Sequence, residues 1–309
     1  MLGDISIAPQ RTLGAVARCT GIGLHSGRPV TMTLRPAAPD TGIIFRRLDA
    51  GAEIEANWAN TTESALCTVL TNGEGIKVST IEHLMAALAG SRIDNAIVEL
   101  SGAEVPIMDG SAAPFMRLIA HAGIMAQDAA RRVFKVLRPI RVGDKGATAE
   151  LLPDHGFSMS FAIDYDNPLI RRQDLSLAFE PETFATELAP ARTYGLLDDL
   201  PRLKAAGLAL GGSLDNAVVI SGTQVLNAGG LRFADECVRH KLLDAMGDLY
   251  LAGGPIIGHF RGVRSGHALT RRLLMALFAD SSAWCVTTIA ETAALGTAAW
   301  SDGMRVASA

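Results

Sequence analysis

The sequence predicts an α+β protein built from two related domains, each a β-sheet with a pair of helices. Strand-like segments come before helix-like segments in each half, and the order helix, strand, helix then occurs in both. With 309 residues, the chain also exceeds the size to which one hydrophobic core usually grows. A duplicated α+β unit explains the length and the repeated order together.

The first domain is expected to span residues 1–126 and to begin with a sheet. Residues 30–36 alternate between apolar and polar side chains, and residues 42–45 form a short apolar run. The glycine-dense loop of residues 21–27 matches neither the GxxxxGK[ST] nor the GxGxxG pattern. A tight turn between strands is therefore favoured over a nucleotide-binding loop.

Two helices and a strand complete the first domain. Ser79 is placed as an N-cap, with Glu82 three residues later as in a capping box and Gly90 as the end, so a helix is predicted from Ser79 to Gly90. A strand over residues 95–100 and a second helix over residues 112–122 follow.

The second domain, residues 127–309, is expected to repeat this layout. Strands are predicted over residues 134–137, 149–152, 157–164 and 255–260, and helices over residues 236–251 and 267–278. The Leu-rich segment 191–220 interrupts the order and is interpreted as a helix between two short strands. Two roles are equally favoured for this segment: it covers the core, or it lines a site for lipid. The small, turn-rich tail from about residue 290 is expected to be disordered.

Composition excludes several classes of protein. Lys plus Arg (28) and Asp plus Glu (32) nearly cancel, so nucleic acid is not an expected partner. The N-terminus lacks the basic and apolar regions of a signal peptide, and no run of about 18 residues lacks interruption by charge, Gly or Pro. We therefore expect a cytoplasmic protein without a membrane span. The four cysteines are widely spaced, which indicates reduced thiols and no zinc finger.

Three titratable side chains lie four residues apart in an otherwise apolar stretch: His240, Asp244 and Asp248. On a helix, His240 and Asp244 fall one turn apart on the same face, so an imidazole and a carboxylate can reach a single ion together. A solvated helix face or a local ion pair is the simpler interpretation of this stretch alone.

A hydrolytic zinc site needs three protein ligands and one open position. His83, His240 and Asp244 would form such a set, drawn from the first helix of each half. Glu82 does not share a helix face with His83, so it is better placed as a general base than as a fourth ligand. The peptidase motif HExxH does not occur, and HxxEH fails because residue 79 is Ser.

His267 begins the last predicted helix, directly after Gly266. A helix N-terminus disfavours a charged imidazole, so a proton donor at this position needs a nearby acid, for which Asp248 is the natural candidate. A surface or capping role is the common alternative for a histidine at a helix start. The same simple interpretation applies to His25, for which the sequence offers no partner.

Several phrases together resemble the UDP-3-O-acyl-N-acetylglucosamine deacetylase family of zinc amidases, which commits Gram-negative bacteria to lipid A synthesis. The similarity runs in order from about Arg11 to Trp284. The phrases are TIEHL (80–84), IDN (93–95), PIMDGSAAPF (106–115), ARTYG (191–195), GGS (211–213), VRHKLLD (238–244) and SGHAL (265–269).

The resemblance implies two related domains whose helix layers face each other across the active site. It implies that segment 191–220 is a β-α-β insertion that forms an apolar passage for an acyl chain. The implied activity is zinc-dependent hydrolysis of the N-acetyl amide of UDP-3-O-acyl-N-acetylglucosamine. The enzyme is expected to be a cytoplasmic monomer that makes peripheral contact with the inner membrane.

The same resemblance assigns roles to the residues at the site. His83, His240 and Asp244 match the family's zinc ligands, and Glu82 matches its general base. His267 matches the residue that protonates the leaving amine or stabilises the oxyanion.

Four further positions match residues around the substrate. Asp248 orients His267 in the family's pattern, and Thr193 supplies a hydroxyl near the tetrahedral intermediate. Lys241 matches a substrate contact by the metal. Tyr194 stands where Phe is common and Arg264 where Lys is common, and Arg and Lys are not interchangeable at bidentate sites.

Two other classes of function remain open at this point. A metal hydrolase acting on a different acylated amide would keep the same residues. A non-catalytic binding protein with this fold is expected to lack one of the metal-ligating residues or Glu82. All of these residues are present in this sequence.

Overall fold

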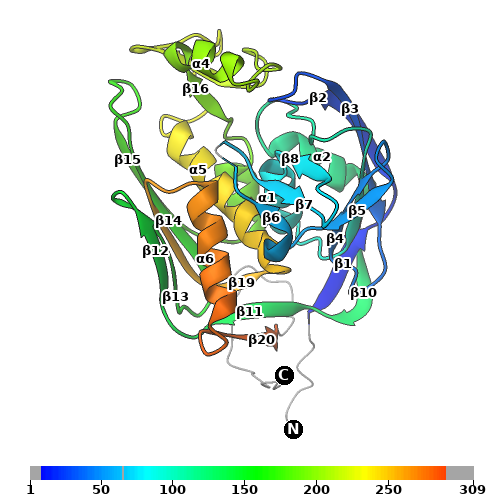
Figure 1. Cartoon of the computed structure of the whole chain (residues 1–309). Coiled ribbons are helices and arrows are strands. Elements are labelled where there is room, and N and C mark those ends of the chain that lie inside the picture. Colours follow the sequence, from blue (N-terminus) through cyan, green and yellow to red (C-terminus); the bar gives the residue numbers. More distant parts are fainter. Residues whose placement is uncertain (1–7, 65, 290–309) are drawn as a thin grey trace.

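Two β-sheets stand on either side of a central group of helices (Figure 1). The computed structural model describes residues 8–64 and 66–289. Helices and strands are mixed as the sequence predicts, and the α+β class is confirmed. The tail for which disorder is predicted lies outside the described residues.

The sheet of the first domain has five strands in the order β2-β3-β9-β4-β5. All neighbours are antiparallel except β4 and β9, which are parallel. In β3, Val30, Met32 and Leu34 are buried while the residues between them are not, as their alternation predicts. The strands are β2 (Ala17–Ile22), β3 (Pro29–Pro36), β4 (Ile43–Arg47), β5 (Ala52–Glu55) and β9 (Ala96–Leu100).

The sheet of the second domain contains the equivalent order β12-β13-β19-β14-β15, with β11 added beside β19 and β20 beside β11. Again the strand after the first helix, β19, is parallel to the strand before that helix, β14. The repeated order and orientation reveal the internal duplication. The strands are β11 (Arg132–Val136), β12 (Ile140–Asp144), β13 (Ala147–Leu152), β14 (Phe157–Asp164), β15 (Arg172–Ala178), β19 (Ile256–Val263) and β20 (Trp284–Thr288).

Each domain contributes a pair of helices to the central layer. The first domain supplies α1 (Glu82–Gly90) and α2 (Ala113–Ala122), and the second supplies α5 (Glu236–Leu249) and α6 (His267–Ala279). A short 3-10 turn, η4 (Tyr250–Ala252), extends α5. The helix layers of the two domains face each other, and α1 lies against α5.

The prediction that the first helix starts at Ser79 is wrong. Ser79 is the last residue of strand β8 (Lys77–Ser79), where its N–H donates to the carbonyl oxygen of Ala103, and it caps no helix. Thr80, with φ of 57°, turns the chain out of that strand, and α1 begins at Glu82. The Glu82 carboxylate is buried and points to the site, so the capping box that the spacing predicted does not form.

A small sheet of three strands leads into α1, and a 3-10 turn packs against α6. The 3-10 turn is η1 (Trp58–Asn60), and the three strands are β6 (Thr61–Thr62), β7 (Val69–Thr71) and β8 (Lys77–Ser79).

The predicted domain boundary at residue 126 falls inside strand β10 (Ile124–Ala130), which pairs with β1 (Pro9–Leu13). The division of the chain at that residue therefore stays a prediction.

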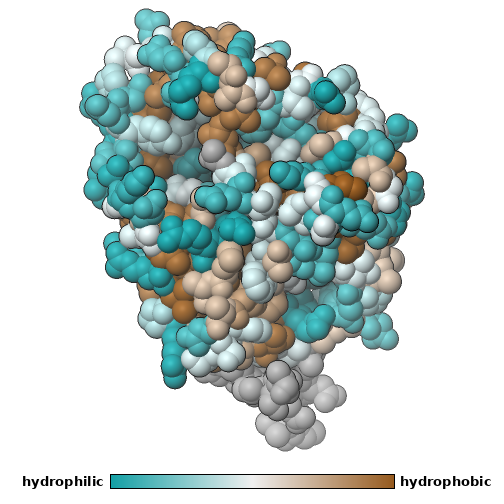
Figure 2. Space-filling model, viewed as in Figure 1, coloured by the Kyte–Doolittle hydropathy of each residue, from teal (hydrophilic) through white to brown (hydrophobic). Residues whose placement is uncertain are grey.

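The Leu-rich segment contains a short helix between two strands, as predicted from its pattern, and the two strands pair in parallel. It lies above α5 in Figure 1, and Figure 2 shows hydrophobic side chains gathered at that end of the molecule. Leu197, Leu210 and Leu214 are exposed there. The elements in and around it are α3 (Pro181–Thr183), η2 (Phe184–Leu188), β16 (Tyr194–Leu196), η3 (Leu197–Asp199), α4 (Leu200–Ala205), β17 (Val218–Ser221) and β18 (Gln224–Val225).

No helix within residues 8–64 and 66–289 is both long and apolar enough to cross a membrane.

Candidate metal centre and active site

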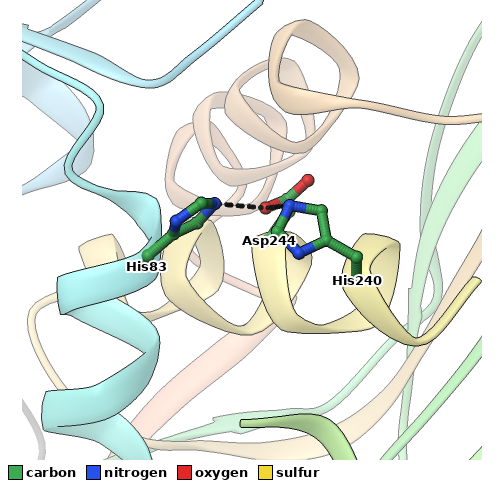
Figure 3. Close-up of side chains that lie close together, drawn as sticks. All are labelled: His83, His240 and Asp244. Carbon is green, nitrogen blue, oxygen red and sulfur yellow. Dashed lines mark ion pairs between the residues drawn. The ribbon is translucent and has the colours of Figure 1, made fainter. Parts of the chain in front are cut away.

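Three buried side chains converge where α1 meets α5. His83 extends from α1 towards His240 and Asp244 on α5 (Figure 3). The Nε2 atoms of His83 and His240 lie 3.5 and 3.2 Å from Asp244 Oδ1, and the three ligand atoms fall within 4.8 Å of one another. The structure therefore brings together the three residues that the sequence predicts as metal ligands.

The protonation of this group fits a metal site. His240 Nδ1 lies 3.0 Å from the carbonyl oxygen of Ala191, to which it donates, so Nε2 carries the free lone pair. Burial lowers the pKa of His240 to about 3, which keeps the ring neutral.

Asp244 supplies the negative charge of the group. Burial acts to raise the pKa of its carboxyl, but His240 and Lys241 outweigh burial and hold that pKa well below its usual range. Oδ1 is buried and has no hydrogen-bond partner among the described residues. A buried oxygen without a partner is costly, and a cation between the two imidazoles would satisfy it. Two imidazoles and one carboxylate are the donors of a catalytic zinc ion.

Glu82 begins α1 beside this group, with only 3% of its surface exposed. Its Oε2 accepts a hydrogen bond of 3.0 Å from the main-chain N–H of Thr68. Its Oε1 lies 3.7 Å from His267 Nε2. Burial raises the pKa of Glu82, which makes its carboxylate a stronger base than an exposed one.

His267 and Asp248 form a hydrogen-bonded pair, as the sequence predicts. His267 is the first residue of α6, and its Nδ1 donates to Asp248 Oδ2 at 2.8 Å. Burial acts to lower the pKa of His267, but the carboxylates of Asp248 and Glu82 outweigh burial and raise that pKa to about 9. The imidazole is therefore charged at neutral pH, with its Nε2 turned towards the metal group.

A cavity of about 180 Å³ opens over these residues. Thr193 and Tyr194 line it as the sequence predicts, and the Tyr194 ring packs edge-on against His240 with their centroids 6.3 Å apart. Lys241 also lines the cavity, but its Nζ donates to Asp244 Oδ2 at 2.5 Å. In this arrangement Lys241 holds the second oxygen of the carboxylate ligand.

Arg264 lies apart from the other candidates. It is exposed, with φ of 52°, and it does not line the cavity. Its N–H donates to the carbonyl oxygen of Ala162 at the end of the sheet. Its predicted contact with substrate therefore needs a substrate that extends beyond the cavity.

Three residues at the site escape prediction from the sequence. His25 lines the cavity, and its Nε2 is buried without a partner among the described residues. Tyr165 lines it too and accepts a hydrogen bond from the Tyr194 hydroxyl. Thr68 donates hydrogen bonds to Glu82 through its main-chain N–H and to Asp248 through its hydroxyl. Each stands alone in the sequence, without a helical spacing that would reveal its partners.

A comparison with family models matches residues 10–279 of the chain to the family described as UDP-3-O-acyl N-acetylglycosamine deacetylase. The chain belongs to this family.

Curated relatives cover nearly the same length. The chain is 49% identical over 286 residues to the UDP-3-O-acyl-N-acetylglucosamine deacetylase of Vibrio parahaemolyticus, covering 91% of this chain and 94% of the relative. It is 51% identical to the enzyme of that name from Chromohalobacter salexigens, covering 90% and 93%. The enzyme of that name from Idiomarina loihiensis is 48% identical, covering 96% and 99%.

Zinc is the metal of this deacetylase family, and the His83, His240 and Asp244 group offers the matching donors. The predicted cofactor and the predicted family are both confirmed.

Proposed function

We propose that this chain hydrolyses the N-acetyl amide of UDP-3-O-acyl-N-acetylglucosamine, yielding acetate and UDP-3-O-acyl-glucosamine, the committed step of lipid A biosynthesis. One observation carries the proposal: a buried three-ligand group shares a cavity with a buried carboxylate and a charged imidazole. The curated relatives that share about half of its residues carry the name of this deacetylase.

We assign the zinc ion to His83, His240 and Asp244. Bound zinc supplies Lewis acidity, which polarises a carbonyl group and lowers the pKa of water towards about 7. The ligands themselves are held in place by the chain. Ala191 fixes the ring orientation of His240, and Lys241 occupies the second oxygen of Asp244.

Glu82 acts as the general base in this proposal. Its Oε1 accepts a proton from the attacking water while the new carbon–oxygen bond forms at the acetyl carbon. The other oxygen, Oε2, is already held by the N–H of Thr68, so one oxygen remains available. Burial of the carboxylate favours accepting a proton over staying charged.

His267 acts as the general acid. Its Nε2 delivers a proton to the sugar nitrogen as the carbon–nitrogen bond breaks, so the amine leaves neutral. Asp248 holds the ring through Nδ1 and keeps it charged before the transfer. The Thr193 hydroxyl, on the wall of the same cavity, is assigned to the developing oxyanion. We assign Lys241, Tyr194 and Arg264 to substrate binding.

The experiment that tests this function is an assay of acetate release by the purified protein. We expect turnover of UDP-3-O-acyl-N-acetylglucosamine and little turnover of N-acetyl sugars that lack the nucleotide or the acyl chain. Equal turnover of all these amides would favour a metal amidase of another specificity. A protein that binds the UDP-sugar and releases no acetate would be a binding protein.

We also propose where the enzyme works. The substrate carries an acyl chain, and the insertion presents exposed leucines, among them Leu210 and Leu214. An apolar passage in segment 191–220 and peripheral contact with the inner membrane, from the cytoplasmic side, suit such a substrate. We propose that the working form is a monomer. Sedimentation of the pure protein, with and without vesicles, tests both points.

A further inference from the structure

Thr68 lies directly before strand β7, at the junction of the two domains. Its side chain is buried, with 8% of the residue exposed. The Oγ1 hydroxyl donates to Asp248 Oδ1 at 2.5 Å and lies 3.1 Å from His267 Nδ1. These partners are 180 and 199 residues away in sequence, so the first domain contacts the acid pair of the second through this hydroxyl.

The main chain of Thr68 makes a second contact with the site. Its N–H donates to Glu82 Oε2 at 3.0 Å. One residue therefore holds the general base through its backbone and the acid pair through its side chain. The two groups that it holds are themselves close, because Glu82 Oε1 lies 3.7 Å from His267 Nε2.

The hydroxyl completes the hydrogen bonding of Asp248. Oδ2 accepts the Nδ1–H of His267, and Oδ1 accepts the O–H of Thr68. A carboxylate bound at both oxygens has little freedom to rotate, so the imidazole plane is fixed with Nε2 towards the cavity. Catalytic groups need such support, because a small misplacement of a proton donor costs much of the rate.

We propose that Thr68 is a positioning residue, which fixes the His267 and Asp248 pair relative to Glu82 for successive proton transfers. The kinetic part of this inference rests on the proposed function, whereas its structural part does not. Thr68 does not line the cavity that we assign to the substrate, so its hydroxyl affects turnover and leaves substrate binding alone.

The test compares two variants of the full-length zinc-loaded protein. Thr68→Val keeps the shape and the main-chain N–H but removes the hydroxyl, and Thr68→Ser keeps the hydroxyl and removes the methyl group. We expect Thr68→Val to lower kcat by roughly 10–100-fold with KM and zinc content unchanged, the usual effect of removing a supporting hydrogen bond. Thr68→Ser should keep most of the wild-type kcat.

Thr71→Val is the matched control. Thr71 is the last residue of β7, the strand that Thr68 precedes, and within the described part of the chain its hydroxyl donates to the main-chain carbonyl of the next residue and not to the site. Its kcat should therefore stay at the wild-type value. If Thr68→Val does not fold, Thr68→Ala and Thr68→Ser replace the comparison. These two differ by one hydroxyl oxygen, and Thr68→Ala should show the roughly 10–100-fold lower kcat while Thr68→Ser keeps most of the wild-type value.

A second readout needs no substrate. The Nδ1–H of His267, shared with Asp248, should give a downfield proton resonance in the NMR spectrum. We expect Thr68→Val to shift or broaden this resonance and Thr68→Ser to preserve it. If the wild-type protein releases no acetate, the proposed function fails while this spectrum still tests Thr68. Wild-type kcat and an unchanged resonance in Thr68→Val would overturn the inference, as would equal impairment of Thr68→Ser.

Discussion

At the scale of single residues, the protonation state of His267 matters most for turnover. Its imidazole is charged and turned to the metal group, and its Nδ1 donates to Asp248 Oδ2 at 2.8 Å. We predict that His267→Ala lowers kcat by roughly 10²–10⁴-fold, the usual range for losing one acid or base. Zinc content, measured by elemental analysis, should not change. Near wild-type turnover would remove His267 from this role.

The pH dependence of turnover should report the same imidazole. Asp248 raises the pKa of His267, so a neutral residue at position 248 must lower it. Because the charged form donates the proton, activity falls as the pH rises through that pKa. Asp248→Asn should therefore move the alkaline limb of the kcat profile to lower pH. An alkaline limb that stays in place in the variant would show that another group sets it.

At the scale of elements, the contact between α1 and α5 decides the geometry of the site. Gly247 faces the first turn of α1, where a Cβ atom would lie 2.0 Å from the carbonyl oxygen of Glu82. Only glycine permits this approach, since the atom that it meets belongs to the backbone. The same contact places His83 opposite His240.

Gly247→Ala should therefore push the two helices apart. We predict a loss of about 1–3 kcal/mol in the free energy of unfolding, as for other overpacked cores, together with a lower kcat. Urea unfolding and acetate release measure the two effects. The control is Gly229→Ala, because Gly229 has open space around its Cβ position. Full activity and stability in Gly247→Ala would mean that the helices tolerate separation.

The insertion makes a second prediction at this scale. Leu210 and Leu214 are 51% and 48% exposed. Burying an apolar side chain of this size is favourable by about 1.5–3 kcal/mol, so contact with an acyl chain would strengthen substrate binding. If they contact the acyl chain, replacing both by Ser should lower kcat/KM by roughly tenfold or more for a long-chain substrate. A substrate with a short chain should be unaffected. Leu48→Ser, at an exposed position in the first domain, is the control. Equal losses for both chain lengths would place the acyl chain elsewhere.

Helical spacing made much of these elements predictable. The segments of α2, α5 and α6 agree with the expected ranges to within a few residues, because their apolar faces and glycine boundaries are local signals. Ser79 misled the prediction of α1, since it pairs with Val69 in the β7–β8 hairpin and its N–H donates to the carbonyl oxygen of Ala103. A capping pattern carries no information about such a partner.

At the scale of the whole molecule, the site exists only where the two domains meet. His83 and Glu82 come from the first domain, whereas His240, Asp244 and His267 come from the second. The i, i+4 spacing revealed His240 and Asp244 as a pair, and the ligand count of a zinc site added His83. The family resemblance supplied the residues around the substrate, such as Thr193. Thr68 and His25 were out of reach, because their roles depend on side chains brought near by folding.

Zinc titration of the metal-free protein, followed by acetate release, tests the central claim most directly. We predict that chelation abolishes turnover of UDP-3-O-acyl-N-acetylglucosamine and that activity returns in proportion to added zinc until zinc equals protein. Asp244→Ala should recover no activity in the same range, since it lacks one ligand. Full turnover in the metal-free protein, or full recovery in Asp244→Ala, would contradict the assignment.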